Sequence, residues 1–155
     1  MPLDPAIDLQ IRGLRAADEP AWRRLWTAYL DFYETELPEA VYRSTFDRLV
    51  ADDPREFHGL LALVDDQPIG LAHFLFHRSC WSVSDLCYLQ DLYVAPEARG
   101  QSLGRALIEA VYAAADAAGH PEVYWQTQHF NAVGRRLYDR VGQLSDFIVY
   151  ERPEA

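Results

Sequence analysis

The chain has few cysteines and no long apolar run, and each absence excludes a class of protein. Among its 155 residues only Cys80 and Cys87 are cysteines, too few for a disulfide framework or a metal cluster, so we expect two buried, reduced thiols. No apolar run is long enough to span a bilayer, so no membrane partner is expected. Residues 1–5 lack a basic stretch followed by an apolar one, so no signal peptide is predicted and we expect a cytoplasmic protein.

The chain is also short of positive charge. Lys and Arg number 14 against 24 Asp and Glu, which gives a net charge of −10. Because nucleic-acid binding depends on basic side chains at the phosphates, no nucleic-acid partner is expected. A negative surface attracts cations, which is compatible with an amine substrate, although many proteins are acidic for solubility alone. The spacing of His58, His73, His77 and His129 does not suit a metal site, so no metal is predicted.

The order of the expected elements indicates the fold class. The length suits a single domain, residues 1–155, and no repeat or low-complexity linker divides it. Apolar spacing predicts six strands, at 8–15, 56–64, 69–76, 86–94, 123–127 and 147–152. It also predicts four helices: one that begins at 18–20, two that cover 42–49 and 103–114, and one that follows Asn131. This order, antiparallel strands followed by β-α-β-α-β, predicts an α/β (α+β) protein whose mixed, mostly antiparallel sheet is flanked by helices.

The most informative stretch joins a strand to a helix. The strand at 90–94 leads into Arg99-Gly100-Gln101-Ser102-Leu103-Gly104, and an amphipathic helix follows. A helix N-terminus carries unpaired N–H groups and a positive dipole end, and small residues before it let a phosphate approach. The spacing fits neither a Walker A loop nor the dinucleotide fingerprint. The alternative is a loop with two glycines that opens a helix without binding anything.

Two motifs in this part of the chain resemble those of a known family. Residues 99–104 look like motif A of the GNAT superfamily, Arg/Gln-x-x-Gly-x-Gly/Ala, with Ser102 in place of the first Gly. Residues 131–138 resemble its motif B, Asn-x-x-Ala-x-x-Leu-Tyr, with Gly134 in place of Ala. The likeness covers nearly the whole chain, through 29–33, 37–38, 88–94, 124–127 and 147–150, and is nearest to the histone and polyamine acetyltransferase branch.

The resemblance implies a cofactor and the residues that hold it. The cofactor would be acetyl-CoA, with pantetheine lying where the strand before motif A splays from the next parallel strand. The residues that the resemblance places along pantetheine are Leu92, Tyr93 and Val94; those around the pyrophosphate are Arg99, Gly100, Gln101, Ser102, Leu103, Gly104 and Arg105; those at the far side are Asn131, Ala132, Gly134 and Tyr138.

Two residues are candidates for catalysis. Acetyl transfer needs a neutral amine, a polarised thioester carbonyl and a stabilised leaving sulfur. The resemblance suggests the backbone N–H of Val94 for the carbonyl and Tyr138 for the sulfur. A phenol with a pKa of about 10 is a weak acid towards a thiolate of about 8.5, so Tyr138 is expected mainly to hydrogen-bond the sulfur. The alternative is a tyrosine that only fills the core.

The group that takes the amine proton stays open. The related polyamine enzymes carry a Glu-Asp pair where this chain has Gln90-Asp91. Gln90 cannot act as a base, and strand alternation predicts that Asp91 points to the opposite face, where pairing with an Arg is an equal alternative. Asp31 and Glu34 either reach the acceptor pocket or belong to a solvated helix end. Gln126 is a further candidate for contact with the acceptor.

We therefore expect an N-acetyltransferase that moves an acetyl group from acetyl-CoA to a primary amine by direct attack in a ternary complex. The acceptor would be a small amine, a polyamine or a lysine side chain. The alternatives are a non-catalytic acyl-CoA-binding module and the use of another acyl donor. After residues 142–146 the sequence predicts one last strand, which would leave an open sheet edge, so a homodimer is expected.

Overall fold

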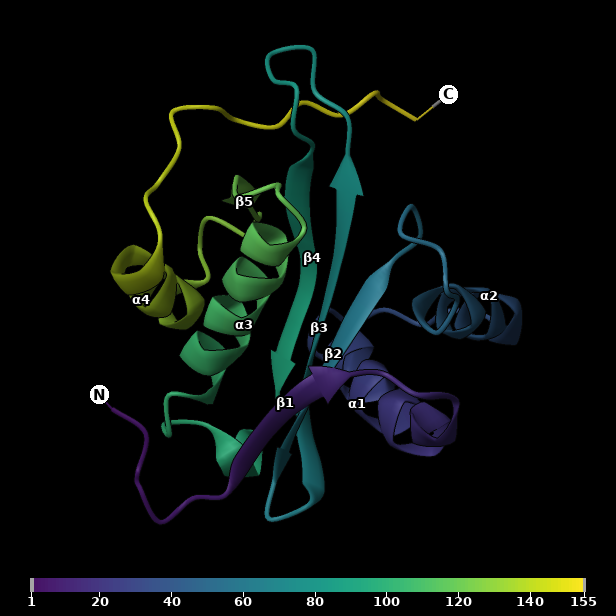
Figure 1. Cartoon of the computed structure of the whole chain (residues 1–155), viewed down its shortest axis with the longest axis vertical. Helices are drawn as coiled ribbons and strands as arrows, with labels where there is room; N and C mark the ends of the chain where they lie inside the picture. Colours follow the sequence, from purple (N-terminus) through teal and green to yellow (C-terminus); the bar gives the residue numbers. More distant parts are fainter. Residues whose placement is uncertain (1, 155) are drawn as a thin grey trace.

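The computed structural model describes residues 2–154 and confirms the expected order of most elements (Figure 1). The strands are β1 (Leu9–Gly13), β2 (His58–Val64), β3 (Gln67–His77), β4 (Leu86–Val94) and β5 (Val123–Tyr124). The α-helices are α1 (Glu19–Phe32), α2 (Glu39–Leu49), α3 (Leu103–Ala117) and α4 (Ala132–Val141), and two short 3-10 turns are η1 (Ala16–Asp18) and η2 (Pro96–Ala98).

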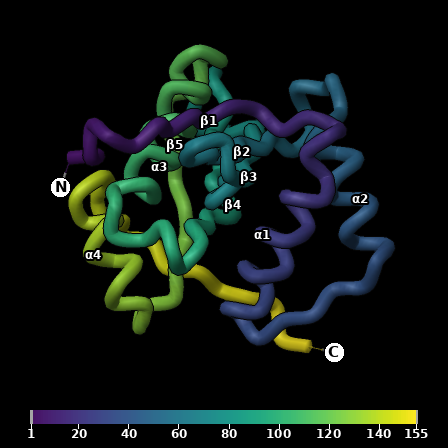
Figure 2. Tube along the Cα trace, turned by 90° about the horizontal axis from the view of Figure 1, so that it is seen from below, coloured from purple at the N-terminus to yellow at the C-terminus, as the bar shows by residue number. Residues whose placement is uncertain are grey.

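The strands form one mixed sheet in the order β1-β2-β3-β4-β5. The first three pairings are antiparallel, and β4 pairs with β5 in parallel through only two residue pairs, Cys87 with Val123 and Tyr88 with Tyr124. Helices α1 and α2 lie on one side of the sheet, and α3 and α4 lie on the other (Figures 1 and 2). The mixed sheet flanked by helices is thereby confirmed.

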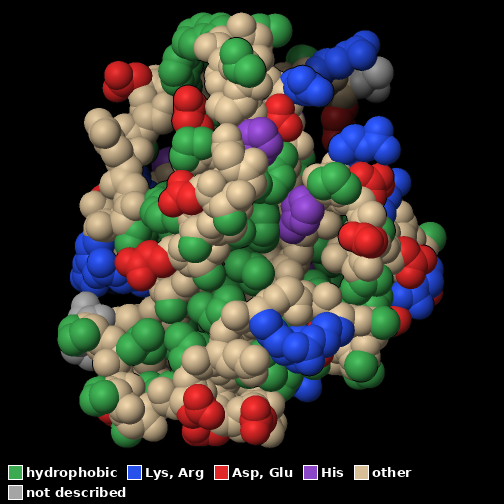
Figure 3. All heavy atoms as spheres, in the orientation of Figure 1, with side chains coloured by type: hydrophobic (Ala, Val, Ile, Leu, Met, Phe, Trp, Pro, Cys, Tyr) green, Lys and Arg blue, Asp and Glu red, His purple; other side chains and the backbone are tan. Residues whose placement is uncertain are grey.

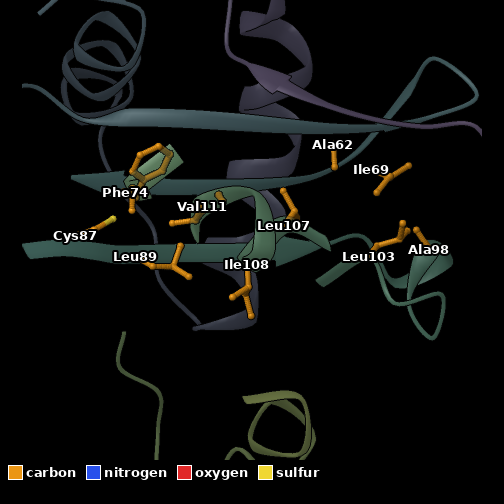
Figure 4. Close-up of a cluster of buried hydrophobic side chains, with 12 residues drawn as sticks. Ala62, Ile69, Phe74, Cys87, Leu89, Ala98, Leu103, Leu107, Ile108 and Val111 are labelled. Carbon is orange, nitrogen blue, oxygen red and sulfur yellow. The ribbon is translucent and has the colours of Figure 1, made fainter. Parts of the chain in front are cut away.

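Each face of the sheet carries its own apolar core. On one face α3 buries Leu107, Ile108 and Val111 against Phe74 and Leu89 of the sheet (Figure 4). These α3 residues recur at helical spacing, as the sequence predicts, and a fully buried side chain of this size contributes roughly 1.5 to 3 kcal/mol. The opposite core consists of residues from α1 and α2 packed on β2 and β3, including Trp22, Leu25, Trp26, Phe46, Leu61 and Leu71.

A bulge in β4 changes which face its side chains meet. His73 pairs with Asp91 but Phe74 pairs with Leu89, so Gln90 has no partner residue on β3. Before the bulge Leu89 belongs to the core under α3, whereas after it Tyr93 belongs to the core under α1 and α2. A bulge inserts one extra residue and therefore shifts the alternation of side chains by one. The expectation that Gln90 and Asp91 point to opposite faces is consequently wrong, because both line one cavity on the α1–α2 side.

The last predicted strand is absent. Residues 147–152 form neither strand nor helix, and the segment crosses from the α4 side towards the side of α1 and α2 (Figures 1 and 2). Its apolar side chains are exposed, from 61% for Val149 to 87% for Tyr150. A run of apolar residues forms a strand only where a neighbouring edge supplies hydrogen bonds, and residues 143–154 do not lie on such an edge within this chain.

The two cysteines differ in burial. Cys87 is buried in the core under α3, as expected, whereas Cys80 is exposed, so that half of the expectation is wrong. Cys80 lies in the loop between β3 and β4, where Trp81 and Val83 are also exposed, and hydrophobic side chains gather at this end of the surface (Figure 3). Among residues 2–154, no helix has the length and apolar character that crossing a membrane requires.

Candidate active site

The strands β4 and β5 part directly beyond their two paired residues. Strand β4 continues to Val94, while residues 125–128 after β5 form no strand. The N–H of Ala95 donates to the carbonyl of Ile69 over 2.7 Å, which makes Val94 and Gly70 a non-hydrogen-bonded pair. Because backbone groups alternate along a strand, the N–H groups of Leu92 and Val94 point away from β3 and into the gap beside β5. This agrees with the splayed parallel pair that the family resemblance implies.

The loop after this gap has unusual backbone geometry. Gly100 has φ +80, and Ser102, directly before α3, has φ 60 and ψ 19. Only glycine occupies this left-handed region without steric cost, and a serine there costs roughly 1 kcal/mol. The position at which the related motif carries Gly is therefore one where the backbone favours Gly, and this chain holds the same conformation with Ser102.

The two arginines of the loop have different partners. Nε of Arg99 donates to the carbonyl of Val94 over 3.0 Å, and its guanidinium lies 5.8 Å from the centre of the Tyr93 ring. Arg105 forms an exposed ion pair with Glu109 over 2.7 Å, one turn further along α3. Beside the start of α3 lies a cavity of about 390 Å³ whose lining includes Ser102 and Arg105. Arg99 thus fastens the loop to the end of β4, while Arg105 borders an open space.

Asn131 caps the helix that faces this loop. Its side-chain oxygen accepts from the N–H of Gly134 over 3.1 Å, and its amide donates to Oγ1 of Thr127 over 3.1 Å, so the predicted N-cap is confirmed. Ala132 is the first residue of α4 and is exposed. A Cβ at Gly104 would lie 3.0 Å from Leu137, so α3 and α4 approach each other closely at this point.

Tyr138 lies on α4 and packs against Trp125, with ring centres 5.7 Å apart. Burial, and then the nearby Tyr33, raise the pKa of the Tyr138 phenol above its ordinary value. The phenol therefore stays neutral over the physiological range and keeps its hydrogen for donation. The ring of Tyr33, directly after α1, lies 5.1 Å from that of Tyr29.

A second, larger cavity of about 730 Å³ lies between α1, α2 and the strands β3 and β4. Most of its lining is apolar or aromatic. The lining residues with titratable or amide side chains are Tyr29, Tyr33, Arg48, His73, Gln90 and Asp91. Asp31, Glu34 and Gln126 are exposed and do not line this cavity. The structure thus brings Gln90 and Asp91 together at the cavity wall and leaves the other acceptor candidates outside it.

Asp91 belongs to a buried hydrogen-bond network that sequence reasoning missed. Its Oδ2 lies 3.0 Å from Nδ1 of His73, and its Oδ1 accepts from the hydroxyl of Tyr29 over 2.8 Å. The indole N–H of Trp22 donates to Nε2 of His73 over 3.0 Å. The proposed pairing of Asp91 with an Arg is not among these contacts. An imidazole within the apolar run 69–76 was the available signal, since a buried polar side chain needs partners.

No metal site is visible in the part of the chain that the structure describes. Residues 2–154 contain no group of three or more His, Cys, Asp or Glu side chains placed to hold an ion. Three polar side chains of the larger cavity, Tyr29, His73 and Asp91, are joined by hydrogen bonds. The chemistry available there is proton transfer and hydrogen bonding.

Comparison with known proteins bears on the chemistry of this site. The model of the acetyltransferase (GNAT) family matches residues 22–143. The chain is 39% identical over 144 residues to the D-amino-acid N-acetyltransferase HPA3 of Saccharomyces cerevisiae, covering 92% of this chain and 89% of that protein. It is 28% identical over 103 residues to the thialysine N-epsilon-acetyltransferase of Caenorhabditis elegans, covering 66% and 64% of the two chains.

Solved structures show the same fold. A crystal structure of a probable acetyltransferase superposes with a TM-score of 0.82 at 23% identity, covering 94% of this chain and 98% of the other. The aminoglycoside N-acetyltransferase AAC(6')-Iy in complex with CoA superposes with a TM-score of 0.79 at 19% identity, covering 99% and 100%. At these identities the likeness concerns the arrangement of helices and strands alone.

Proposed function

Because the chain belongs to the acetyltransferase (GNAT) family, and is thus an acyl-CoA-dependent N-acetyltransferase, we propose that it transfers an acetyl group from acetyl-CoA to a primary amine. The two substrates would be bound together, and the amine would attack the thioester directly. The observation that carries the proposal is the opening between β4 and β5, into which the N–H of Val94 points immediately before the loop at 99–104.

The residues present fit acetyl-CoA. The N–H groups of Leu92 and Val94 face the gap, where an extended pantetheine would pair with them as a further strand does. A Cβ built on Gly100 would meet no atom within 4 Å, so the loop leaves open space for a pyrophosphate at the start of α3. The binding loop for the pyrophosphate would also include Gln101, Leu103 and Gly104. The guanidinium of Arg99, in the same loop, lies over the ring of Tyr93.

On the far side of the gap, Asn131 and Gly134 would hold the start of α4 in place. The charge of the pyrophosphate would meet Arg99 and Arg105. Arg105 is balanced by Glu109 in the structure described, and their exposed ion pair is weak enough to exchange for a phosphate. When bound, acetyl-CoA would supply an activated acetyl group.

The side chains of this protein would divide the work of the reaction. The N–H of Val94 would polarise the thioester carbonyl, because a donor fixed in advance needs no reorganisation as negative charge develops. Tyr138 would donate a hydrogen bond to the departing sulfur, since its raised pKa keeps the phenol protonated. The amine would approach from the cavity of about 730 Å³ beneath α1 and α2.

The acceptor class follows from the charges of that cavity. Asp91 would attract an ammonium group, and Arg48, at the end of α2, would attract a carboxylate. A molecule with both groups is an amino acid, and the yeast relative is named for acetylating D-amino acids. We therefore propose an amino acid as the first acceptor to test, with plain amines and polyamines second. The acceptor would contact the other candidates only at or beyond the mouth of the cavity; these are Asp31, Glu34, Gln90 and Gln126.

A homodimer also belongs to this proposal. The strand β5 pairs along two residues only, and the segment 144–150, whose large apolar side chains are exposed, has no edge of its own chain to join. A second copy would offer that edge, and two such segments would be exchanged by a twofold axis. The cytoplasmic location stays a prediction from the sequence.

A thiol-release assay tests the proposed function. Purified protein is incubated with acetyl-CoA and a panel of amino acids of both configurations, polyamines and simple primary amines, and the free thiol is measured with time. We expect turnover with at least one amine. Acetyl-CoA should also bind when no amine is present. Binding of acetyl-CoA with no turnover for any amine would instead support the alternative, a non-catalytic acyl-CoA-binding module. A parallel panel of longer acyl-CoA donors tests the acyl group.

A further inference from the structure

The hydrogen-bond donors around His73 determine where its hydrogen lies. The indole N–H of Trp22 is a donor only, so Nε2 of His73, 3.0 Å away, must accept and carries no hydrogen. A neutral imidazole with a bare Nε2 has its hydrogen on Nδ1, which lies 3.0 Å from Oδ2 of Asp91. His73 therefore accepts from Trp22 through Nε2 and donates to Asp91 through Nδ1. Its side chain is 5% exposed, so this tautomer is held from both sides.

Asp91 is consequently an acceptor of two fixed hydrogen bonds. Its second oxygen accepts from the hydroxyl of Tyr29 over 2.8 Å. Burial, and then the charge of Asp91, raise the pKa of the Tyr29 phenol, so the hydrogen stays on the phenol and points at the carboxylate. The oxygen of Tyr29 has two lone pairs, the side chain of Tyr33 lies close to it, and Tyr29 itself lines the cavity.

This network lies beside the end of β4, where the N–H of Val94 faces the gap. The ring of Tyr29 is 6.4 Å from that of Tyr93, the residue before Val94, and 5.1 Å from that of Tyr33. Burial, and then Tyr33, raise the pKa of the Tyr138 phenol. A group bound between Tyr29 and Tyr138 would therefore face a carboxylate on one side and a hydrogen-bond donor on the other. The remaining charged or titratable side chains of the cavity wall are Arg48 and His73.

We propose that Asp91, acting through the hydroxyl of Tyr29, accepts the proton that the acceptor amine loses, and that His73 positions Asp91 for this role. The inference rests on the proposed function and assigns the base of that reaction. As the nitrogen of a neutral amine bonds to the carbonyl carbon, its N–H becomes acidic. That proton passes to the oxygen of Tyr29 while the hydrogen of Tyr29 passes to Asp91.

The step balances in atoms and charge. An N–C bond forms and the C–S bond breaks, the electron pair leaves on sulfur, and Asp91 becomes a neutral carboxylic acid. Tyr138 donates a hydrogen bond to the departing sulfur, and solvent afterwards protonates the thiolate and takes the proton from Asp91. Tyr29 ends the step as it began, with one hydrogen. His73 and Trp22 exchange no proton, which is why His73 is a positioning residue and not a catalytic one.

The main experiment compares Asp91→Asn and Tyr29→Phe with the wild-type enzyme over a range of pH. We expect kcat to fall about 100- to 1,000-fold for Asp91→Asn and about 10- to 100-fold for Tyr29→Phe, with the KM for acetyl-CoA unchanged within about twofold. The pH dependence of kcat should change in Asp91→Asn, because the variant lacks the group that takes the proton. Formate added to Asp91→Ala should restore at least about tenfold in rate, and the absence of rescue would overturn the proposal.

The matched control is Asp18→Asn. Asp18 is a carboxylate of similar burial, with its side chain 12% exposed against 11% for Asp91, and it pairs with Arg12 outside the cavity. This variant should lose stability but keep kcat and the pH profile. For His73, the variant His73→Asn retains a donor near the place of Nδ1 and should keep more than about a fifth of kcat, whereas His73→Leu should lose most of it. Equal loss in both would overturn the positioning role.

The outcomes separate this inference from the proposed function. Turnover by the wild-type enzyme together with an unchanged kcat and pH profile in Asp91→Asn would refute the inference and leave the acetyltransferase intact. Binding of acetyl-CoA without wild-type turnover for any amine would refute the proposed function and, with it, the inference. Should Asp91→Asn fail to fold, Tyr29→Phe decides the question, because it removes only the hydroxyl and keeps the packed ring.

Discussion

A Cβ on Gly134 would lie 2.5 Å from Nδ2 of Asn131, the side chain that caps α4. Alanine stabilises a helix interior by about 1 kcal/mol relative to glycine. Here the methyl group would push the capping side chain away, and loss of an N-cap costs about 1 kcal/mol. The two effects offset each other, so we expect Gly134→Ala to give no gain in the free energy of unfolding, measured by urea denaturation.

The coupling between these two residues has its own control. In a protein that already carries Asn131→Ala, the obstacle is gone, so Gly134→Ala should then raise stability by about 0.5 to 1 kcal/mol. The same Gly→Ala change at Gly119 is not a fair comparison, because Gly119 has φ +79 and strains any other residue. A gain from Gly134→Ala that is equal with and without Asn131 would contradict the explanation.

Ser102 gives a second prediction about backbone strain. With φ 60 it occupies a conformation that favours glycine, so Ser102→Gly should stabilise the chain by up to about 1 kcal/mol. Ser102→Ala keeps the strain but removes the hydroxyl. We expect the glycine variant to bind CoA at least as tightly as the wild type in calorimetry, since the loop conformation is unchanged. Weaker binding in both variants would show that the hydroxyl itself contacts the phosphate.

Much of this architecture could be predicted from the sequence because its signals are local. The apolar spacing in α3 predicts which of its residues are buried, and Leu103, Leu107 and Val111 are all in the core. Asn131 before a helix predicts its cap. The loop at 99–104 can be read as a cradle because a strand and a helix flank it. These features depend on neighbours a few residues apart, which sequence patterns record.

The rest depends on contacts between distant segments. The bulge at Gln90 arises from the pairing of β4 with β3 and reverses the face that alternation assigns to Asp91. The network that joins Trp22, His73 and Asp91 spans residues up to 69 positions apart, and each bond in it needs the packed fold. Exposure of Cys80 follows from a loop that no periodicity describes. The strand predicted at 147–152 has the right pattern but no edge to pair with in its own chain.

The buried thiol of Cys87 should make the free energy of unfolding depend on pH in the alkaline range. Burial raises the pKa of its thiol to about 11, above its ordinary value of 9.0. Between these values the unfolded chain loses the proton while the folded chain keeps it, so the stability is fully present below about pH 9 and is lost as the pH rises to about 11. The loss attributable to Cys87 should be about 2 to 3 kcal/mol.

The measurement is urea denaturation at pH 7, 9 and 10.5. Cys87→Ala should be less stable than the wild type at pH 7, because it leaves a small cavity, and the difference should shrink as the pH rises. Cys80→Ser, at an exposed thiol, should follow the wild-type curve at every pH. A constant difference between the wild type and Cys87→Ala would contradict the prediction.

Tyr138→Phe separates the role of the phenol from that of the ring. The ring packs on Trp125 and should stay in place, so binding of CoA should change by less than about twofold. Loss of a hydrogen bond to a charged sulfur should lower kcat about 10- to 100-fold. Tyr112→Phe is the matched control, because its hydroxyl donates to the carbonyl of Val141 in the same core and lies outside the proposed reaction. Unchanged kcat in Tyr138→Phe would remove its assigned role.

The exposed segment 144–150 predicts the state of association. Its large apolar side chains, Leu144, Phe147, Ile148, Val149 and Tyr150, are between 61% and 87% exposed. Burial of one such side chain is worth roughly 1.5 to 3 kcal/mol, and a twofold axis would bury two copies of the segment. A dissociation constant of 1 μM requires about 8 kcal/mol, so the gross gain can exceed this even after the cost of association.

We therefore expect light scattering after gel filtration to give about twice the chain mass of 17.8 kDa at micromolar concentration. A chain ending at Gln143, and the double variant Phe147→Asp with Val149→Asp, should run as monomers. Arg152→Ala, a polar change just beyond the apolar segment, should leave the dimer intact. If the full chain is monomeric at tens of micromolar, the dimer prediction is wrong. If the truncated chain still dimerises, the segment 144–150 is not the interface.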